Sequence, residues 1–174
     1  MKGQSLYQLF VDELKDMLDA ENLLVDSLPK LIKAATFPDL KEAISNHLKE
    51  TQHQVQRLEK IFSILGIPAK QKPCKAMQGL IKEADELLAH FSKSAVLDAA
   101  IISAAQKVEH YEIASYGTLV SFANYLDLDS SIIDLLQEIL DEEGAADKKL
   151  TKIAEGSLFT SGVNKEAVES SSKR

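Results

Sequence analysis

Apolar side chains recur every three to four residues along four long stretches of this chain, which is the spacing of one face of an α-helix. The pattern predicts long helices at about 5–35, 38–65, 94–125 and 131–156. A shorter helix is predicted at about 76–91. No stretch shows the alternation typical of a half-buried β-strand. The sequence therefore predicts an all-α protein.

The connections between these helices indicate how they are arranged. Short turns join the first two long helices at 36–39 and the last two at 127–130, which favours two antiparallel hairpins. The short helix then lies in the longer connection between the hairpins. We therefore expect an antiparallel four-helix bundle with an additional helix, formed by residues 1–156. Residues 157–174 are polar and aperiodic, and they are predicted to be a mobile tail.

Capping residues agree with these bounds. Gly66 followed by Pro68 is typical of a helix end, and Pro38 suits the first turn of a helix. At the start of the last long helix, Ser131 and Asp134 have the spacing of a capping box.

Acidic side chains interrupt the apolar faces of three long helices. Glu21, Glu112 and Glu143 each lie near the middle of such a face, and no Lys or Arg shares these faces. Desolvation of an unpaired ion costs about 20 kcal/mol in the idealised case, and several kcal/mol remain in real proteins. A pair of metal ions would supply the missing positive charge. The remaining long helix places His47 and other polar residues in its apolar face.

Helical phase adds further candidate metal ligands, because residues one turn away from these acids reach the same level of the bundle. Carboxylates dominate these candidates, which favours iron or manganese in a dinuclear centre. His53 lies three residues after Glu50, but its phase points away from the apolar face. His47 is equally well interpreted as a ligand or as a core histidine bonded to Glu50 or Gln54. The candidate metal ligands are Glu21, His47, Glu50, Glu109, Glu112, Glu143 and Asp147.

Composition narrows the class of protein. A chain of 174 residues is expected to form one domain, and its net charge of −7 argues against nucleic-acid binding. The absence of a long apolar run and of a signal-like start argues against a membrane location and favours the cytoplasm. The single cysteine, Cys74, excludes a disulfide within the chain and any CxxC metal site.

Four segments resemble the YciF-type bacterial stress proteins of the ferritin-like superfamily. These segments are LPKLIKAAT (28–36), HLKETQHQ (47–54), AAQKVEHYEIASYGTL (104–119) and EEGAADKKL (142–150). The resemblance covers nearly the whole chain up to about residue 154. It implies a five-helix ferritin-like fold, often dimeric, that is similar to rubrerythrin and other dimetal carboxylate proteins.

The resemblance also implies ligand positions. Glu21 matches the superfamily's acidic residue on the first helix, and Glu109 with Glu112 resembles the two-Glu version found in rubrerythrin. The YciF-type pattern emphasises His47 and Glu50, together with Thr51 and Gln54, rather than His53. The last long helix departs from the superfamily, because Ala146 replaces the usual histidine and Asp147 is the nearest substitute. The Cys₄ module of rubrerythrins is absent, so a peroxidase cycle would need an external electron donor.

Two functions follow. In the first, the chain is a stress-associated homodimer whose dinuclear Fe or Mn centre handles iron, oxygen or peroxide. No catalytic residue is assigned, and an oxidase or peroxidase activity stays open. In the alternative, the chain is a non-enzymatic dimeric scaffold with a degenerate metal site. A third interpretation of the acidic positions is that dimerisation buries a second face of the helices, which would shift the apparent apolar stripes.

Overall fold

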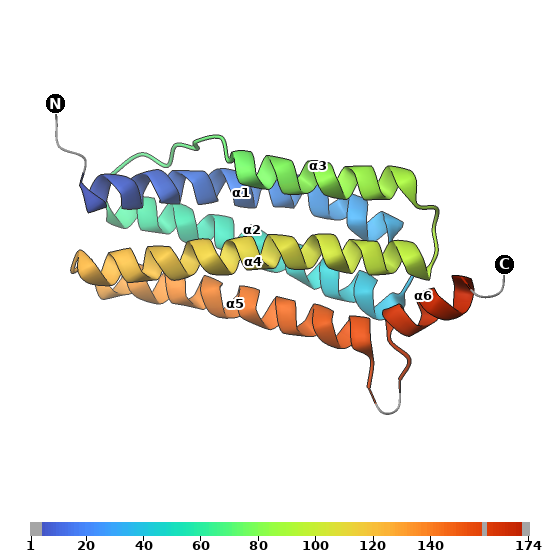
Figure 1. The fold of residues 1–174 in the computed structure, drawn as a ribbon. Coiled ribbons are helices and arrows are strands. Elements are labelled where there is room, and N and C mark those ends of the chain that lie inside the picture. Colours follow the sequence, from blue (N-terminus) through green and yellow to red (C-terminus); the bar gives the residue numbers. More distant parts are fainter. Residues whose placement is uncertain (1–4, 158–159, 172–174) are drawn as a thin grey trace.

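The computed structural model describes residues 5–157 and 160–171, and they form an all-α protein, as predicted (Figure 1). The described part of the chain contains six helices. They are α1 (Leu6–Ala34), α2 (Pro38–Ile64), α3 (Lys75–His90), α4 (Ala95–Tyr125), α5 (Ser130–Glu155) and α6 (Val163–Ser171).

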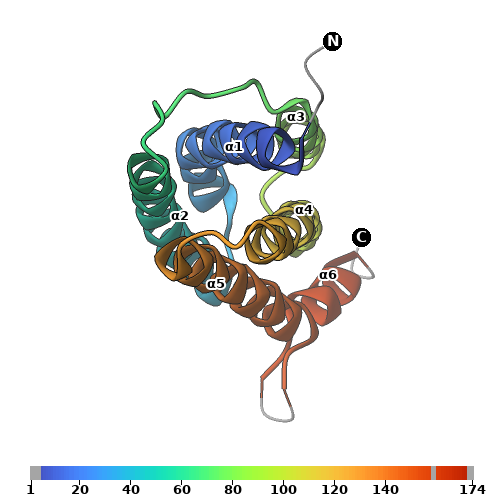
Figure 2. The same cartoon turned by 90° about the vertical axis from the view of Figure 1, so that its left-hand side faces the viewer.

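The four long helices form the predicted bundle. The hairpin α1–α2 packs on the hairpin α4–α5, with α2 against α5 and α1 against α4, so that the four helices enclose one core (Figure 2). Helix α3 lies along α1 and α4 and occupies the connection between the hairpins (Figure 1). None of the described helices is both long enough and apolar enough to cross a membrane.

Local sequence determines where α1 and α2 begin and end. Ser5 and Gln8 form a capping box, in which each side chain accepts a hydrogen bond from the other's backbone amide. Pro38 occupies the first turn of α2. Gly66 follows the end of α2 with a φ of 67°, and the amide of Ile67 donates to the carbonyl of Phe62 across it at 3.1 Å. This geometry explains why the helix stops at a glycine.

The start of α5 differs from the prediction. Its cap is Asp129, whose carboxylate accepts a 2.8 Å hydrogen bond from the amide of Ser131. The capping box expected between Ser131 and Asp134 is wrong. Asp129 comes earlier in the chain, and its carboxylate already accepts from the amide of Ser131. The helix therefore begins at Ser130.

The turn between α1 and α2 is held by a buried acid from α4. The carboxylate of Asp98, which is 1 % exposed, accepts hydrogen bonds from the amide of Thr36 at 2.7 Å and from the amide of Phe37 at 3.1 Å. The hydroxyl of Thr36 donates to the same carboxylate. Asp98 therefore satisfies backbone donors at the start of α2 and ties one hairpin to the other.

Helix α6 lies within the segment that the sequence predicts as a mobile tail, and it packs against α4 and α5. The backbones of Gly156 and Gly162 meet so closely that a Cβ on Gly162 would lie 2.3 Å from the carbonyl carbon of Glu155. This contact brings Val163 into the core, where it is fully buried. Residues 158–159 and 172–174 of the predicted tail lie outside the described residues.

Candidate metal centre

A group of acidic and imidazole side chains meets inside the bundle, and each of the four long helices contributes to it. Ligand atoms of His47, Glu109, Glu112 and Glu143 all lie within 4.8 Å of one another. Glu21 from α1 is fully buried beside them, close enough to raise the pKa of Glu112. The sequence therefore predicted correctly that the acids of separate helices converge.

Helical spacing explains this convergence. Glu109 and Glu112 are three residues apart on α4, so both point toward the bundle axis, and they are 2 % and 0 % exposed. His47 is 8 % exposed, and its Nε2 lies 3.4 Å from an oxygen of Glu109. The structure thus places His47 at the cluster. His53 lies on the exposed side of α2.

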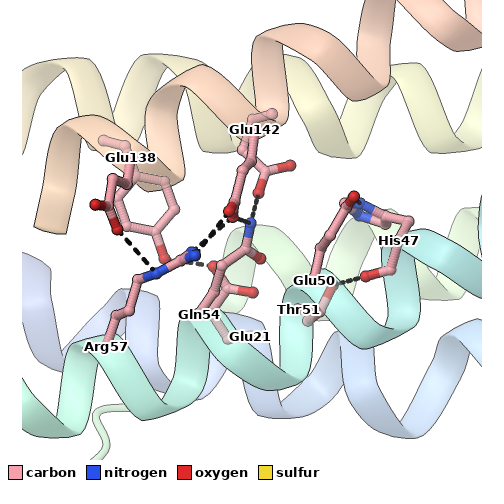
Figure 3. A network of polar contacts seen from close by, with 10 residues as sticks. Glu21, His47, Glu50, Thr51, Gln54, Arg57, Glu138 and Glu142 are labelled. Atoms are coloured by element: carbon pink, nitrogen blue, oxygen red, sulfur yellow. Dashed lines mark hydrogen bonds and ion pairs between the residues drawn. The ribbon is translucent and has the colours of Figure 1, made fainter.

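Neutral side chains hold two of the carboxylates. The hydroxyl of Tyr116 donates a hydrogen bond to Glu21, and the amide of Gln54 donates to Glu143. The same amide donates to Glu142 at 2.9 Å (Figure 3). In the sequence, Gln54 stands out as a polar residue on an apolar face and as part of the YciF-type pattern. Its contact with Glu143 depends on how α2 and α5 pack together.

An ion pair that was not predicted lies at the rim of the cluster. Arg57 binds Glu142 through two hydrogen bonds of 2.7 and 2.8 Å, and its Nε lies 3.3 Å from Glu138 (Figure 3). Arg57 therefore balances acids at the rim. Within the described residues, no ion pair joins a Lys or Arg to Glu21, Glu109, Glu112 or Glu143.

Several buried polar atoms of the cluster have no hydrogen-bond partner among the described residues. They belong to side chains on all four long helices. Unpaired polar atoms in an apolar interior cost about 1–3 kcal/mol each, and more when they are charged. The atoms are Glu21 Oε2, His47 Nε2, Gln54 Oε1, Glu109 Oε2, both carboxylate oxygens of Glu112 and Glu143 Oε2.

The carboxylates also disfavour one another's charge. Burial raises the pKa of Glu21, Glu109 and Glu112 well above the ordinary value. Nearby acids raise it further: Glu143 acts on Glu21 and Glu109, and Glu21 acts on Glu112. Burial and then Glu21 raise the pKa of Tyr116, so its hydroxyl stays protonated and remains a donor at neutral pH.

His47, Glu109, Glu112 and Glu143 offer ligand atoms that could hold a metal ion. The fully ionised cluster would carry four negative charges, from Glu21, Glu109, Glu112 and Glu143, and two divalent ions would balance them. One imidazole among four carboxylates is a donor set suited to iron or manganese. The unpaired oxygens supply the lone pairs that such ions require.

Two predicted ligands lie at the edge of this cluster. The side chain of Glu50 is 46 % exposed, with an oxygen 3.8 Å from Nδ1 of His47, and its interaction with that imidazole lowers the pKa of Glu50. Asp147 is 21 % exposed and accepts a 3.1 Å hydrogen bond from Gln106. The structure does not bring either residue into the group of ligand atoms around Glu112.

Fold and cluster together define a helical-bundle protein with a buried, carboxylate-rich centre. The chain belongs to the family described as Domain of unknown function (DUF892), whose pattern matches residues 5–167. It is 42 % identical to the protein YciF of Escherichia coli over 166 residues, which cover 95 % of this chain and 99 % of that protein. The predicted family resemblance is confirmed.

Solved structures agree with this assignment. A protein from Rhodopseudomonas palustris, described as YcfI, a putative structural protein, is 44 % identical and matches with a TM-score of 0.84 over 87 % of this chain and 96 % of that one. The E. coli stress protein YciF matches with a TM-score of 0.82 at 42 % identity, over 86 % and 94 %. A protein from Xanthomonas campestris, 19 % identical with a TM-score of 0.68 over 96 % and 95 %, supports the fold alone.

Proposed function

We propose that this chain is a metal-binding stress protein with a dinuclear Fe or Mn centre in the middle of its bundle. The observation that carries the proposal is the convergence of Glu21, Glu109, Glu112 and Glu143 without a pairing cation among the described residues. Such a group is costly to bury as anions. Bound metal would remove that cost and use every unpaired oxygen.

The contacts suggest how the ligands are shared. Glu143 influences both Glu21 on one side and Glu109 on the other. Both carboxylate oxygens of Glu112 are unpaired. Glu112 also lies close to Glu21 of α1 and to Glu109 of α4. Glu112 and Glu143 would therefore hold the metal, together with His47 and Glu109, and Glu21 is the further carboxylate buried beside them.

The surrounding residues orient the ligands. Tyr116 donates to one oxygen of Glu21 and leaves the other free, and Gln54 does the same for Glu143. Such hydrogen bonds fix carboxylate orientation and raise metal affinity. When bound, the metal pair would supply the capacity to exchange electrons with a small oxidant or to bind and oxidise iron.

The role in stress is supported by the related E. coli protein, which is described as a stress protein. Handling of iron, oxygen or peroxide fits a buried centre made of hard oxygen ligands.

A second function is favoured by two observations. The R. palustris relative is described as a putative structural protein, and α5 offers no histidine beside Glu143. The chain would then be a non-enzymatic scaffold. Its raised carboxyl pKa values would keep the acids protonated, with Tyr116 and Gln54 supplying hydrogen bonds.

Thermal unfolding separates the two functions. A ligand at about 100 times its Kd stabilises the folded state by about 2.7 kcal/mol. For a chain of this size, that corresponds to a rise in Tm of about 5–10 °C. The metal-centre proposal predicts this rise on adding Mn²⁺ or anaerobic Fe²⁺ to chelator-treated protein. An unchanged melting curve would support the scaffold instead.

A further inference from the structure

A small cavity reaches the cluster at the place where helix α3 packs along α1 and α4 (Figure 2). Its volume is about 30 Å³. His47 and Glu109, which are 8 % and 2 % exposed, line its inner end. Asp85 of α3, whose side chain is 46 % exposed, lines its outer end. The cavity therefore extends from the surface of the bundle toward the proposed metal centre.

The volume restricts the occupant to a very small molecule. A cavity needs about 10–15 Å³ of this kind of volume to hold one water, and this cavity has about twice that. By comparison, an engineered apolar cavity that binds benzene has about 150 Å³. A molecule of two heavy atoms therefore fits, and a ring does not.

Most of the cavity wall is apolar, and three helices supply it. Leu24 and Leu31 come from α1, Ile81 and Ala84 from α3, and Val108 from α4. Side chains of this kind offer dispersion contacts to an occupant but no hydrogen bond.

The polar groups that line the cavity are already engaged. The hydroxyl of Ser27 donates to a backbone carbonyl of its own helix at 3.3 Å, and the carboxylate of Asp85 accepts from Nζ of Lys30 at 3.0 and 3.1 Å. At the inner end, the unpaired atoms His47 Nε2 and Glu109 Oε2 are enclosed within the cluster and do not open into the cavity. A hydrogen-bonding occupant would therefore give up its bonds to water for few new ones, and an apolar occupant would give up none.

A second cavity, about 160 Å³ between α2 and α5, also reaches His47 and Glu109, but its lining is different. Three charged side chains contribute to it, namely Glu50, Glu142 and Lys149. Charged groups keep water close to them, so this larger cavity suits polar molecules. The cluster thus has one charged approach and one apolar approach.

We propose that the cavity between α1, α3 and α4 binds dioxygen. Dioxygen has two heavy atoms, carries no charge and needs no hydrogen bond, which are the properties that the volume and the wall select. Hydrogen peroxide is of similar size, but the cavity disfavours it because its two hydroxyl groups would lack partners. Binding of the gas stands on the cavity alone. That the bound gas is the oxidant of the centre rests on the proposed function.

Dioxygen itself is the probe, because it is paramagnetic and broadens the NMR signals of methyl groups that it contacts. Methyl spectra of the metal-free protein are recorded under raised pressure of oxygen and, as the control for pressure, of nitrogen. We expect oxygen to broaden the signals of Ala84 and Val108 more than the signal of Ala89, an exposed alanine on α3. Broadening at Ala84 and Val108 that does not exceed that at Ala89 would overturn the proposal.

Matched substitutions test the location. Ala84→Leu fills the cavity, so the oxygen-dependent broadening at Val108 should fall about tenfold, since the gas could enter only by overpacking the site. Ala89→Leu adds the same side chain to the exposed side of α3 and should leave the broadening unchanged. Ser27→Leu blocks the cavity from α1 if Ala84→Leu misfolds. Broadening at Val108 that survives both blocks would contradict the assignment.

The role of the gas at the centre is tested separately. Dioxygen would accept two electrons, one from each of two Fe²⁺ ions, together with two protons from solvent, and leave as hydrogen peroxide. In protein loaded anaerobically with Fe²⁺ and then mixed with oxygen, Ala84→Leu should slow this oxidation about tenfold relative to Ala89→Leu. Equal rates would refute the supply of oxidant through this cavity.

Failure of this proposal is distinguishable from failure of the metal centre. A chain that binds Fe²⁺ stoichiometrically but shows no selective broadening would refute the cavity alone. A chain that shows the broadening but takes up no Fe²⁺ would refute the centre, and with it the oxidant role, but not the binding of the gas.

Discussion

Gln54 donates a hydrogen bond from its side-chain amide to the buried carboxylate of Glu143. The amide also reaches Glu142, which Arg57 holds at the rim. A single neutral side chain thus links the inner acid to a surface ion pair. It leaves one oxygen of Glu143 free, as a ligand requires.

Replacing Gln54 with Leu should therefore weaken metal binding while the chain still folds. Loss of such an orienting partner typically costs about 10–100-fold in metal affinity. Competitive titration of Mn²⁺ against a chelator measures this change. Gln52→Leu is the matched control, because Gln52 lies on the exposed side of the same helix. Equal affinities of the two variants would show that the Gln54 contact does not orient the ligand.

The buried carboxyls give the metal-free protein an unusual pH dependence. Burial and Glu21 raise the folded pKa of Glu112, so above the ordinary pKa of about 4.3 the folded chain keeps a proton that the unfolded chain releases. This contribution to stability is complete below that pH and is lost as pH rises through the folded pKa. Glu112→Gln cannot ionise and should escape the loss.

Urea unfolding in the presence of a chelator, at about pH 5 and pH 8, measures the effect. Relative to the wild type, the Glu112→Gln variant should gain stability between the lower and the higher pH. Parallel pH profiles for the two proteins would mean that the pKa of Glu112 is the same in the folded and the unfolded chain.

The contact of Asp98 with the α1–α2 turn predicts a loss of stability that is independent of metal. Asp98→Ala removes the acceptor for the amides of Thr36 and Phe37. The expected cost in the free energy of unfolding is about 2–4 kcal/mol, since hydrogen bonds to charged groups contribute about 1.5–3 kcal/mol each and do not add fully.

Asp26→Ala is the control, because Asp26 is exposed on α1 and its replacement should change stability by no more than about 0.5 kcal/mol. Both measurements use denaturant unfolding of metal-free protein. An Asp98→Ala variant as stable as Asp26→Ala would show that the hydrogen bonds of Asp98 to the α1–α2 turn do not stabilise the fold.

Much of the architecture could be predicted because helical periodicity is a local property. The apolar faces that defined the bundle also placed Glu21, Glu112 and Glu143 at its centre, and the structure brings these acids together. Helical phase favoured His47 over His53 without deciding which is a ligand, and the structure places His47 at the cluster. These conclusions need only the spacing of residues along one helix.

The remainder depended on how separate elements pack. The contacts of Gln54 with Glu143 and of Arg57 with Glu142 join α2 to α5, and no pattern within one helix reveals them. Helix α6 packs on α4 and α5 after a close backbone approach of Gly156 and Gly162, and the polar composition of the segment gave no sign of this packing. The edge positions of Glu50 and Asp147 similarly reflect the rotation of each helix in the bundle.

Anaerobic titration with Fe²⁺ tests the central claim most directly, with bound metal counted per chain. The account predicts about two equivalents for the wild type. It predicts the same for Glu59→Gln, an exposed acid on α2, and loss of stoichiometric binding for Glu112→Gln. Wild-type protein that takes up no Fe²⁺ above background, or a Glu112→Gln variant that binds like the wild type, would contradict it.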